Sequence, residues 1–288
     1  MDPKSQTIGT QVVKKNKKIA YSPWDSWDAR EYLKTYFSKL GQDSYENLKF
    51  IVRELKKLQP NPKRKILDFG AGPTIFAGVA AAPYAGTIHL CDYLESNLIE
   101  IKKWLSSNED SFDWSYCIKH ILELEGLESH EFAIQERADV FKKKAESVFR
   151  SDASLEWPIF SEMHEKYPVV ISNFCADSAT SSKEVWRAYM KNIFNTVEDE
   201  GVLLITALRN CKFYKSGESI FPSANVNEED LENILIENGF SKKNLLIEVK
   251  SVPACADEGF TTIMCVSATK LTKKEREIVK IFQELPKK

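Results

Sequence analysis

The sequence predicts an α/β fold in which helices cover both faces of a mostly parallel sheet. An apolar run at 65–69 ends in a tight turn that contains Gly70 and Gly72. Apolar residues with helical spacing follow, and a second apolar run, 87–91, ends in Asp92. This order is typical of strand, turn, helix and strand in a parallel sheet. Because such folds bind ligands beyond the carboxyl ends of their strands, the stretch indicates an adenosine-type cofactor.

Ahead of the first strand, the chain is expected to form a tail and a helical cap. Residues 1–18 are polar and lysine-rich, which predicts a flexible tail. Residues 19–60 carry aromatic side chains and two helical patterns, the first with Asp25 or Ser26 as a candidate N-cap and the second over 43–58. We expect this cap either to pack its rings on the main domain or to close over a ligand as a lid.

Residues 61–270 are predicted to form the main domain and 271–288 a helical C-terminal tail, so that the chain is one structural domain overall. Apolar periodicity predicts further strands at 167–173, 201–207, 245–252 and 261–269, and helices at 94–105, 118–126, 130–150, 183–197 and 228–238. The last two strands are close enough in sequence to pair antiparallel. The stretch 213–217 is expected to be a mobile substrate loop hinged at Gly217.

Composition and charge exclude several classes of function. The 288 residues are 43% hydrophobic and 28% charged, with 40 basic and 42 acidic side chains well mixed, so we expect no nucleic-acid partner. No segment approaches the roughly 18 apolar residues of a membrane span, and the first residues lack the apolar core of a secretion signal. The six cysteines form no C-x-x-C pair and the four histidines are scattered. We expect a cytoplasmic monomer with reduced thiols and no metal site.

Two classes of cofactor compete for the first strand–turn–helix unit. In a dinucleotide site a third glycine lets the helix approach the pyrophosphate, but bulky Ile75 and Phe76 stand in that region here. Asp92 follows Gly70 by 22 positions at the end of a strand, where a carboxylate can accept hydrogen bonds from both ribose hydroxyls. Asp68 suits a cationic sulfonium and its amino-acid head better than a pyrophosphate. Together with the two late strands, these residues favour S-adenosylmethionine.

Several strings of residues make the chain recognisable. They are Tyr32-Leu33-x-x-Tyr36-Phe37, Leu67-Asp68-x-Gly70-x-Gly72-Pro73-Thr74-Ile75-Phe76, Asp92-Tyr93-x-x-x-Asn97, Lys103-Trp104-Leu105, Phe112-Asp113-Trp114-Ser115, Leu124-Glu125-Gly126 and Glu258-Gly259-Phe260. With these strings, spread over about residues 20–270, the chain resembles the nicotinamide, phenylethanolamine and thioether methyltransferase family. The resemblance implies a seven-stranded, mostly parallel Rossmann-like sheet with helices on both faces and an N-terminal helical cap.

The resemblance also implies a cofactor site. The residues that it assigns to S-adenosylmethionine are Tyr32, Phe37, Gly70, Phe76, Asp92, Asn97, Asp152, Ala153 and Asn173. Tyr32 and Phe37 would cover the cofactor from the cap, and Gly70 would meet its amino-acid portion. Asp92 would hold the ribose, and Asp152 would accept a hydrogen bond from the adenine amino group.

The acceptor side departs from the family at one position. Relatives of the nicotinamide and phenylethanolamine types carry an acidic residue just after the fifth strand, where it contacts the acceptor, whereas Thr206 stands at that place here. The expected acceptor contacts are Phe174, Thr206, Asn210, Ser223 and Asp257. For each of them, packing or a surface position explains the residue equally well, and no side chain is singled out as catalytic.

Methyl transfer from a sulfonium is an in-line displacement that mainly requires alignment of the reacting atoms and exclusion of water. Positive charge moves toward the acceptor during the reaction, so aromatic faces and carbonyl dipoles favour it. The sequence therefore predicts an enzyme that transfers a methyl group from S-adenosylmethionine to a small-molecule acceptor, in first place an amine or pyridine nitrogen. A thioether or other soft acceptor, and a cofactor-binding protein that has lost catalysis, remain as alternatives.

Overall fold

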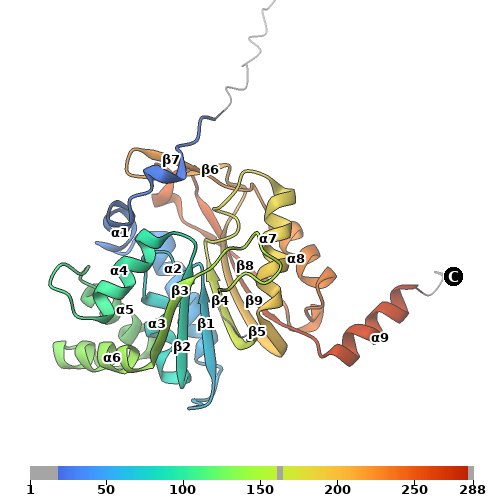
Figure 1. Cartoon of the computed structure of the whole chain (residues 1–288), viewed down its shortest axis with the longest axis horizontal. Coiled ribbons are helices and arrows are strands. Elements are labelled where there is room, and N and C mark those ends of the chain that lie inside the picture. The colour runs from blue at the N-terminus through green and yellow to red at the C-terminus, as the bar shows by residue number, and fades with distance from the viewer. Residues whose placement is uncertain (1–18, 161–164, 285–288) are drawn as a thin grey trace, which may run out of the picture.

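A seven-stranded sheet forms the centre of the molecule, which a computed structural model describes over residues 19–160 and 165–284. The strand order is β3-β2-β1-β4-β5-β9-β8 (Figure 1). The bounds are β1 (Lys65–Phe69), β2 (Thr87–Asp92), β3 (Ala145–Arg150), β4 (Tyr167–Asn173), β5 (Val197–Leu208), β8 (Leu246–Ser251) and β9 (Thr262–Thr269). The first five strands in this order pair parallel, and β9 runs antiparallel to β5 and β8. The predicted fold class is confirmed, while the tail at 1–18 lies outside the described residues.

Helices cover both faces of the sheet because successive residues of a strand point to opposite sides. In β1, Ile66 packs in the core under the helices that precede β3, whereas Leu67 packs in the core under α7 and α8. The helices are α1 (Ala29–Phe37), α2 (Gln42–Leu55), α3 (Phe76–Ala81), α4 (Glu95–Leu105), α5 (Ser115–Glu125) and α6 (Glu131–Lys144) on the first face, and α7 (Lys183–Asn195) and α8 (Glu228–Glu237) on the second. Figure 1 shows these two layers, with α9 (Lys273–Glu284) extending away from them.

The direction of the strand order reverses between β1 and β4. From β1 the chain continues to β2 and then β3 on one side, whereas β4 and β5 lie on the other side. The loops that leave the carboxyl ends of β1 and β4 therefore diverge, and open α/β sheets bind ligands at such a point. Asp68 near the end of β1 and Asn173 at the end of β4 flank it.

The expected helix at 130–150 is wrong in its second part. α6 ends at Lys144, and the following residues form the edge strand β3, which pairs parallel with β2. No Gly or Pro separates the helix from the strand, so the sequence carries no turn signal at this place. Pairing with β2 decides the conformation of this half-exposed segment, as tertiary contacts commonly do for edge strands.

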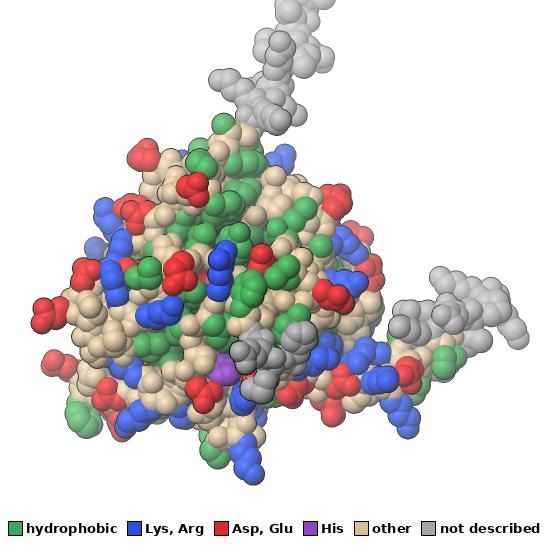
Figure 2. Space-filling view, in the orientation of Figure 1, with side chains coloured by type: hydrophobic (Ala, Val, Ile, Leu, Met, Phe, Trp, Pro, Cys, Tyr) green, Lys and Arg blue, Asp and Glu red, His purple; other side chains and the backbone are tan. Residues whose placement is uncertain are grey.

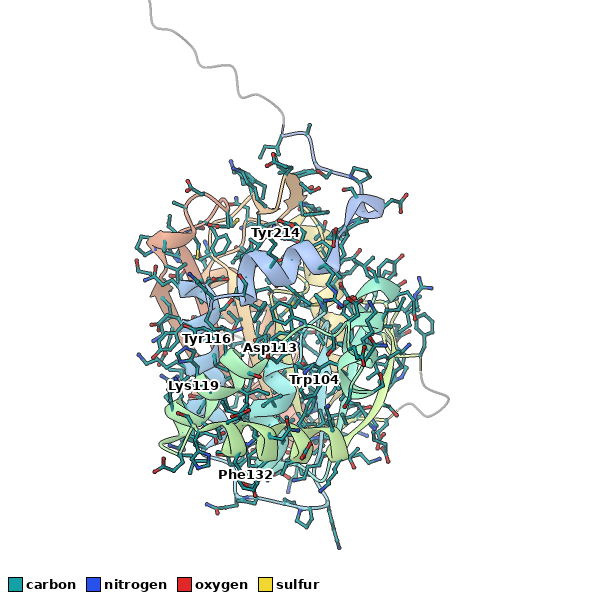
Figure 3. The ribbon with its side chains drawn as sticks, turned by 90° about the vertical axis from the view of Figure 1, so that its left-hand side faces the viewer. Trp104, Asp113, Tyr116, Lys119, Phe132 and Tyr214 are labelled. Carbon is teal, nitrogen blue, oxygen red and sulfur yellow. The ribbon has the colours of Figure 1, made fainter. Side chains whose placement is uncertain are left out.

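The stretch 213–217, expected as a mobile loop, is a strand and a turn. β6 (Phe213–Ser216) pairs antiparallel with β7 (Ser219–Pro222), and Gly217 lies in the turn with φ +56°. The Tyr36 hydroxyl of α1 donates to the Lys215 carbonyl oxygen at 2.7 Å. Figure 3 shows Tyr214 between this hairpin and α1. The hairpin is therefore fastened to the cap.

The first helix of the cap begins two or three residues later than the candidate caps would place it. Asp28 is the N-cap of α1, because its side chain accepts hydrogen bonds from two backbone N–H groups of the first turn at 2.8 and 3.0 Å. Asp25 and Ser26, the expected caps, belong to a preceding 3₁₀ turn. Asp25 lies inside this short turn and Asp28 two residues after it, so the sequence offered two aspartates as caps within four positions.

Charged side chains of both signs are mixed over the surface. Figure 2 shows Lys and Arg interspersed with Asp and Glu on one face, without a large area of one sign. Within the described ranges, no helix combines the length and apolar character needed to cross a membrane. In the same part of the chain, no three His, Cys, Asp or Glu side chains are grouped so that they could hold a metal ion.

A buried lysine supports the end of α7. Lys270, which follows β9, is 8% exposed, and its Nζ donates to the carbonyl oxygens of Phe194 and Val197 at 2.6 and 2.9 Å. Phe194 lies in the last turn of α7, where carbonyls lack helical partners and attract a cation. Burial lowers the pKa of Lys270 to about 8.

We expect Lys270→Met to lower the free energy of unfolding by about 1–3 kcal/mol near neutral pH, because two buried carbonyls lose their donor. The pKa of about 8 in the folded state lies below the ordinary lysine value of 10.5, so the wild type should gain stability over the variant as the pH rises between these values. Urea unfolding at a series of pH values measures both effects. Lys274→Met, at an exposed position of α9, is the control, and equal stability of the two variants would contradict the role of Lys270.

Candidate active site

A cavity of about 370 Å³ lies at the carboxyl ends of β1, β2 and β4, with α1 and α2 on its walls. The nine residues expected to bind the cofactor all line it, and so does Phe174. These nine are Tyr32, Phe37, Gly70, Phe76, Asp92, Asn97, Asp152, Ala153 and Asn173. They come from the cap, from three strand ends and from the loop after β3, so the fold gathers residues that are far apart in the sequence.

Four residues expected to contact the acceptor are not among those that line the cavity. Thr206 is fully buried and its Oγ1 donates to the Asn47 Oδ1 at 2.7 Å, so it faces α2. Ser223 is buried directly after β7. Asn210 and Asp257 are exposed. The structure therefore brings only Phe174 of the expected acceptor contacts to the cavity.

Asp92 organises the loop at the end of β2. Its Oδ1 accepts hydrogen bonds from the Leu94 backbone N–H and the Asn97 side-chain amide, both at 2.9 Å, and its Oδ2 accepts one from the Gly72 N–H at 2.8 Å. Burial raises the pKa of Asp92, whereas these hydrogen bonds lower it. The Trp27 indole N–H donates to the Asn97 Oδ1 at 2.8 Å, which connects the cap to the same loop.

The two glycines of the turn after β1 serve different purposes. Both have positive φ angles, +69° at Gly70 and +63° at Gly72, which favour glycine. A methyl group on Gly70 would overlap the Cys175 side chain, so this glycine allows β1 and the loop after β4 to approach each other. A methyl group on Gly72 would meet nothing within 4 Å. Gly72 thus leaves room at the cavity wall.

Asp68 is a buried carboxyl group without a hydrogen bond to one of its oxygens. It is 2% exposed, and its Oδ2 has no partner among the side chains and backbone groups of the described residues. Burial, and then the neighbouring Asp92, raise the pKa of Asp68 to about 8. Two acidic groups at adjacent strand ends, one of them without a partner, form a site that a cation would stabilise.

Aromatic rings of the cap cover the cavity. Trp27 and Tyr32 lie with their ring centroids 5.1 Å apart, and those of Tyr32 and Tyr36 are 4.9 Å apart. The rings of Phe37 and Phe76 are stacked at 5.5 Å, so the cap also packs against the first turn of α3. Trp27, Tyr32, Tyr36 and Phe37 line the cavity, where aromatic rings favour cationic groups. The cap therefore packs on the main domain and also lines the cavity, as the two expected arrangements of its rings describe.

Three polar residues in the first turns of α2 also line the cavity, and they were not among the predicted site residues. They are Asp43, Ser44 and Asn47. Gly41 is the N-cap, so Asp43 lies inside the helix instead of capping it. Asp43 is 4% exposed, burial raises its pKa, and the Cys255 Sγ lies 3.4 Å from its Oδ1. A signal existed in the sequence, since Asp43 and Asn47 are one helical turn apart and share a face with buried apolar residues.

The wall of the cavity is acidic. Four aspartate side chains line it, namely Asp43, Asp68, Asp92 and Asp152, and among the described residues that line it there is no Lys, Arg or His. The aromatic side chains lie between these acidic groups. Such a wall favours cationic or amine-bearing molecules. It disfavours phosphates and carboxylates, because it offers them no basic side chain.

Comparison with known proteins decides the family. The model described as NNMT/PNMT/TEMT family matches residues 17–271. The chain belongs to this family. Among its relatives, indolethylamine N-methyltransferase of Oryctolagus cuniculus is 29% identical, over 78% of this chain and 86% of the relative. Nicotinamide N-methyltransferase of Homo sapiens is 26% identical, over 75% of this chain and 82% of the relative.

The fold is also shared with solved structures. An S-adenosylmethionine-dependent methyltransferase from Clostridium acetobutylicum matches with a TM-score of 0.51 at 13% identity, over 85% of this chain and 98% of that chain. The family membership confirms the predicted family, enzyme class and cofactor, so the protein is an S-adenosylmethionine-dependent methyltransferase. The acidic, partner-free Asp68 and the open space at Gly72 fit a cofactor with a sulfonium and an α-amino group.

The two glycines give a matched pair of variants of the methyltransferase. Gly72→Ala should lower the free energy of unfolding by about 1–2 kcal/mol, because its methyl group has space and only the positive φ opposes it. Gly70→Ala should cost clearly more, since the overlap with Cys175 is added to the same backbone strain. Urea unfolding of the ligand-free protein measures both values. A Gly70 variant as stable as the Gly72 variant would show that β1 and the loop after β4 do not need this close approach.

Proposed function

We propose that this methyltransferase transfers the methyl group to the nitrogen of a small amine or pyridine that binds in the aromatic cavity. One observation carries the proposal: the cavity wall combines four aspartate side chains with aromatic rings and, within the described part of the chain, contains no basic side chain. Acceptors that gain positive charge on nitrogen are stabilised by such a wall. The relatives named above are indolethylamine and nicotinamide N-methyltransferases, which act on nitrogen.

In this proposal the cofactor occupies the part of the cavity between α1 and the ends of β1, β2 and β4. Asp92 accepts from the ribose hydroxyls, with its orientation fixed by Gly72 and Asn97. Asp68 and Asn173 receive the amino-acid end. The remaining proposed contacts are Tyr32 and Phe37 as cover, Gly70 and Phe76 at the methionine portion, Asn97 as support of the loop, and Asp152 with Ala153 at the adenine.

The acceptor occupies the other part, between Phe174, Tyr36 and the first turn of α2. Asp43 is the acidic group there, and it is buried among the rings of the cap. Because burial raises its pKa, Asp43 is a stronger base than an exposed aspartate. It can hold an amine by a charge-assisted hydrogen bond and take the proton that the nitrogen releases.

The remaining catalytic work is alignment and exclusion of water. When bound, S-adenosylmethionine supplies an electrophilic methyl group on a sulfonium, which is a good leaving group. The rings of Trp27, Tyr32 and Tyr36 close the cavity, and the Tyr36–Lys215 hydrogen bond keeps the β6–β7 hairpin against the cap. This closure holds the acceptor nitrogen in line with the methyl group.

We also propose that the enzyme works as a monomer in the cytoplasm on a free small molecule, without a nucleic-acid partner. The six cysteines are free thiols, which suits a reducing compartment. The mixed surface charge in Figure 2 does not resemble a phosphate-binding surface.

A screen of acceptors with S-adenosylmethionine labelled on its methyl group tests the proposed function. Primary and secondary amines and pyridines should accept label, and thioethers should accept less. Label on thioethers alone would overturn the nitrogen acceptor, and no label on any acceptor would favour loss of catalysis.

Asp43→Asn should raise the KM for the amine acceptor roughly tenfold or more, because a charge-assisted hydrogen bond is replaced by a neutral one. Affinity for S-adenosylhomocysteine, measured by calorimetry, should stay unchanged. Asp257→Asn, which changes an exposed carboxylate outside the cavity, is the matched control. If the control raised the KM and Asp43→Asn did not, the acceptor would lie toward the loop of Asp257 instead of α2.

Asp92→Ala should weaken S-adenosylhomocysteine binding by about 1.5–3 kcal/mol, the usual contribution of charge-assisted hydrogen bonds. Asp139→Ala, an exposed aspartate on α6, is the control for charge removal. Thermal unfolding of both ligand-free variants separates lost contacts from lost structure, since Asp92 also holds the Gly72 and Leu94 N–H groups. Unchanged affinity of a folded Asp92 variant would remove Asp92 from the ribose site.

A further inference from the structure

Three buried polar atoms on the cavity wall lack hydrogen-bond partners in the part of the chain that the structure describes. They are Asp68 Oδ2, Asn173 Oδ1 and Asn47 Nδ2. Asp68 and Asn47 are 2% and 1% exposed, so water reaches neither side chain freely. A buried polar atom without a partner costs stability, and native proteins keep such atoms chiefly where a ligand or a function uses them. Three such atoms around one cavity indicate that one chemical group of a ligand contacts all of them.

The sheet places these atoms near one another. Asp68 lies on β1, and β4 pairs with β1 and carries Asn173 at its end. In the register of β4 and β5, Asn173 stands opposite Thr206. Thr206 is in turn hydrogen-bonded to Asn47 of α2. One continuous series of neighbours thus connects the three atoms at the point where the strand order reverses.

The Thr206 hydroxyl decides which atom of Asn47 remains available. It donates to the Asn47 Oδ1 at 2.7 Å, so the carbonyl oxygen of that amide already has its partner. The Nδ2 is left as a donor on the cavity wall. Asp68 Oδ2 and Asn173 Oδ1 are both acceptors when Asp68 is ionised. Two acceptors beside one donor match the α-ammonium and carboxylate of a free amino-acid group.

We propose that Asn47 donates a hydrogen bond to the carboxylate of the amino-acid end of S-adenosylmethionine, and that Thr206 positions Asn47 for this contact. The inference rests on the proposed place of the cofactor. Asp68 and Asn173 accept from the α-amino group. The stacked rings of Phe37 and Phe76 near this end have no polar atom, and the described cavity wall has no basic residue. The buried Asn47 Nδ2, a donor without a partner among the described residues, is therefore the group assigned to the carboxylate.

This assignment explains why Thr206 replaces the acidic residue that the resemblance places after the fifth strand. A carboxylate at 206 would accept from the Asn47 amide instead of donating to it. The amide would then turn its oxygen toward the cavity, where it would oppose a carboxylate. A threonine hydroxyl holds the amide in the opposite orientation. Thr206 therefore serves the cofactor through Asn47 and does not contact the acceptor.

Three ligands separate the parts of the proposal in calorimetric titrations. S-adenosylhomocysteine carries the whole amino-acid end, its decarboxylated analogue keeps only the amino group, and 5′-methylthioadenosine lacks both groups. Asn47→Leu should weaken S-adenosylhomocysteine roughly tenfold to a hundredfold, as expected for a lost charge-assisted hydrogen bond. The same variant should bind the other two ligands as the wild type does. Leucine keeps the number and branching of the side-chain heavy atoms but is larger, so binding of these two ligands also shows whether the cavity is intact.

Variants at Thr206 test its positioning role through the ratio of the affinities for S-adenosylhomocysteine and its decarboxylated analogue. Thr206→Val should lower the preference for S-adenosylhomocysteine over its decarboxylated analogue, and Thr206→Ser should restore it because the hydroxyl returns. A merely structural role would lower all three affinities together and leave this ratio unchanged.

Two results would overturn the inference without touching the proposed function. One is an Asn47→Leu variant that loses affinity equally for the ligands with and without the carboxylate. The other is a variant that binds S-adenosylhomocysteine normally but has a raised KM for the acceptor, which would assign Asn47 to the acceptor. Failure of the wild-type protein to bind S-adenosylhomocysteine would instead refute the proposed function itself.

Discussion

The hydrogen bonds received by Asp92 are the interaction on which the site depends. A single buried carboxylate holds the backbone of the glycine turn through Gly72, the start of α4 through Leu94, and the cap through Asn97 and Trp27. Three segments that are distant in sequence are thus fixed around one pair of oxygen atoms. Since each of them also lines the cavity, the shape of the cavity follows from the geometry of this carboxylate.

The same region holds several buried acidic groups. Burial raises the pKa values of Asp43, Asp68 and Asp92 together, and the described cavity wall offers them no cation. Removing such groups from water costs stability unless a partner compensates. A ligand with cationic groups supplies that partner. Part of the free energy that burial of these acidic groups costs is then recovered when the ligand binds. Binding should therefore stabilise the fold by more than the contact area alone suggests.

Much of this arrangement could be predicted, and the rest depends on contacts between distant segments. Strand ends such as Asp92 were visible because an apolar run, a carboxylate and a helix follow one another in the chain. β3 was missed because only its pairing with β2 separates it from α6. Thr206 was expected just after the fifth strand as an acceptor contact, but it lies within β5, and its hydrogen bond to Asn47 joins residues 159 positions apart. No local pattern reveals on which side of a strand such a partner lies.

The position of α2 connects the two halves of the cavity. Asp43 and Asn47 are one helical turn apart on α2 and line the same cavity, so on the proposed placement one helix contacts both the acceptor and the amino-acid end of the cofactor. Asn47 is tied to β5 through Thr206, and Asp43 lies against the Cys255 thiol after β8. A shift of α2 would therefore move both contacts at once. On the proposed placement, acceptor recognition and cofactor binding both depend on how this one helix packs on the sheet.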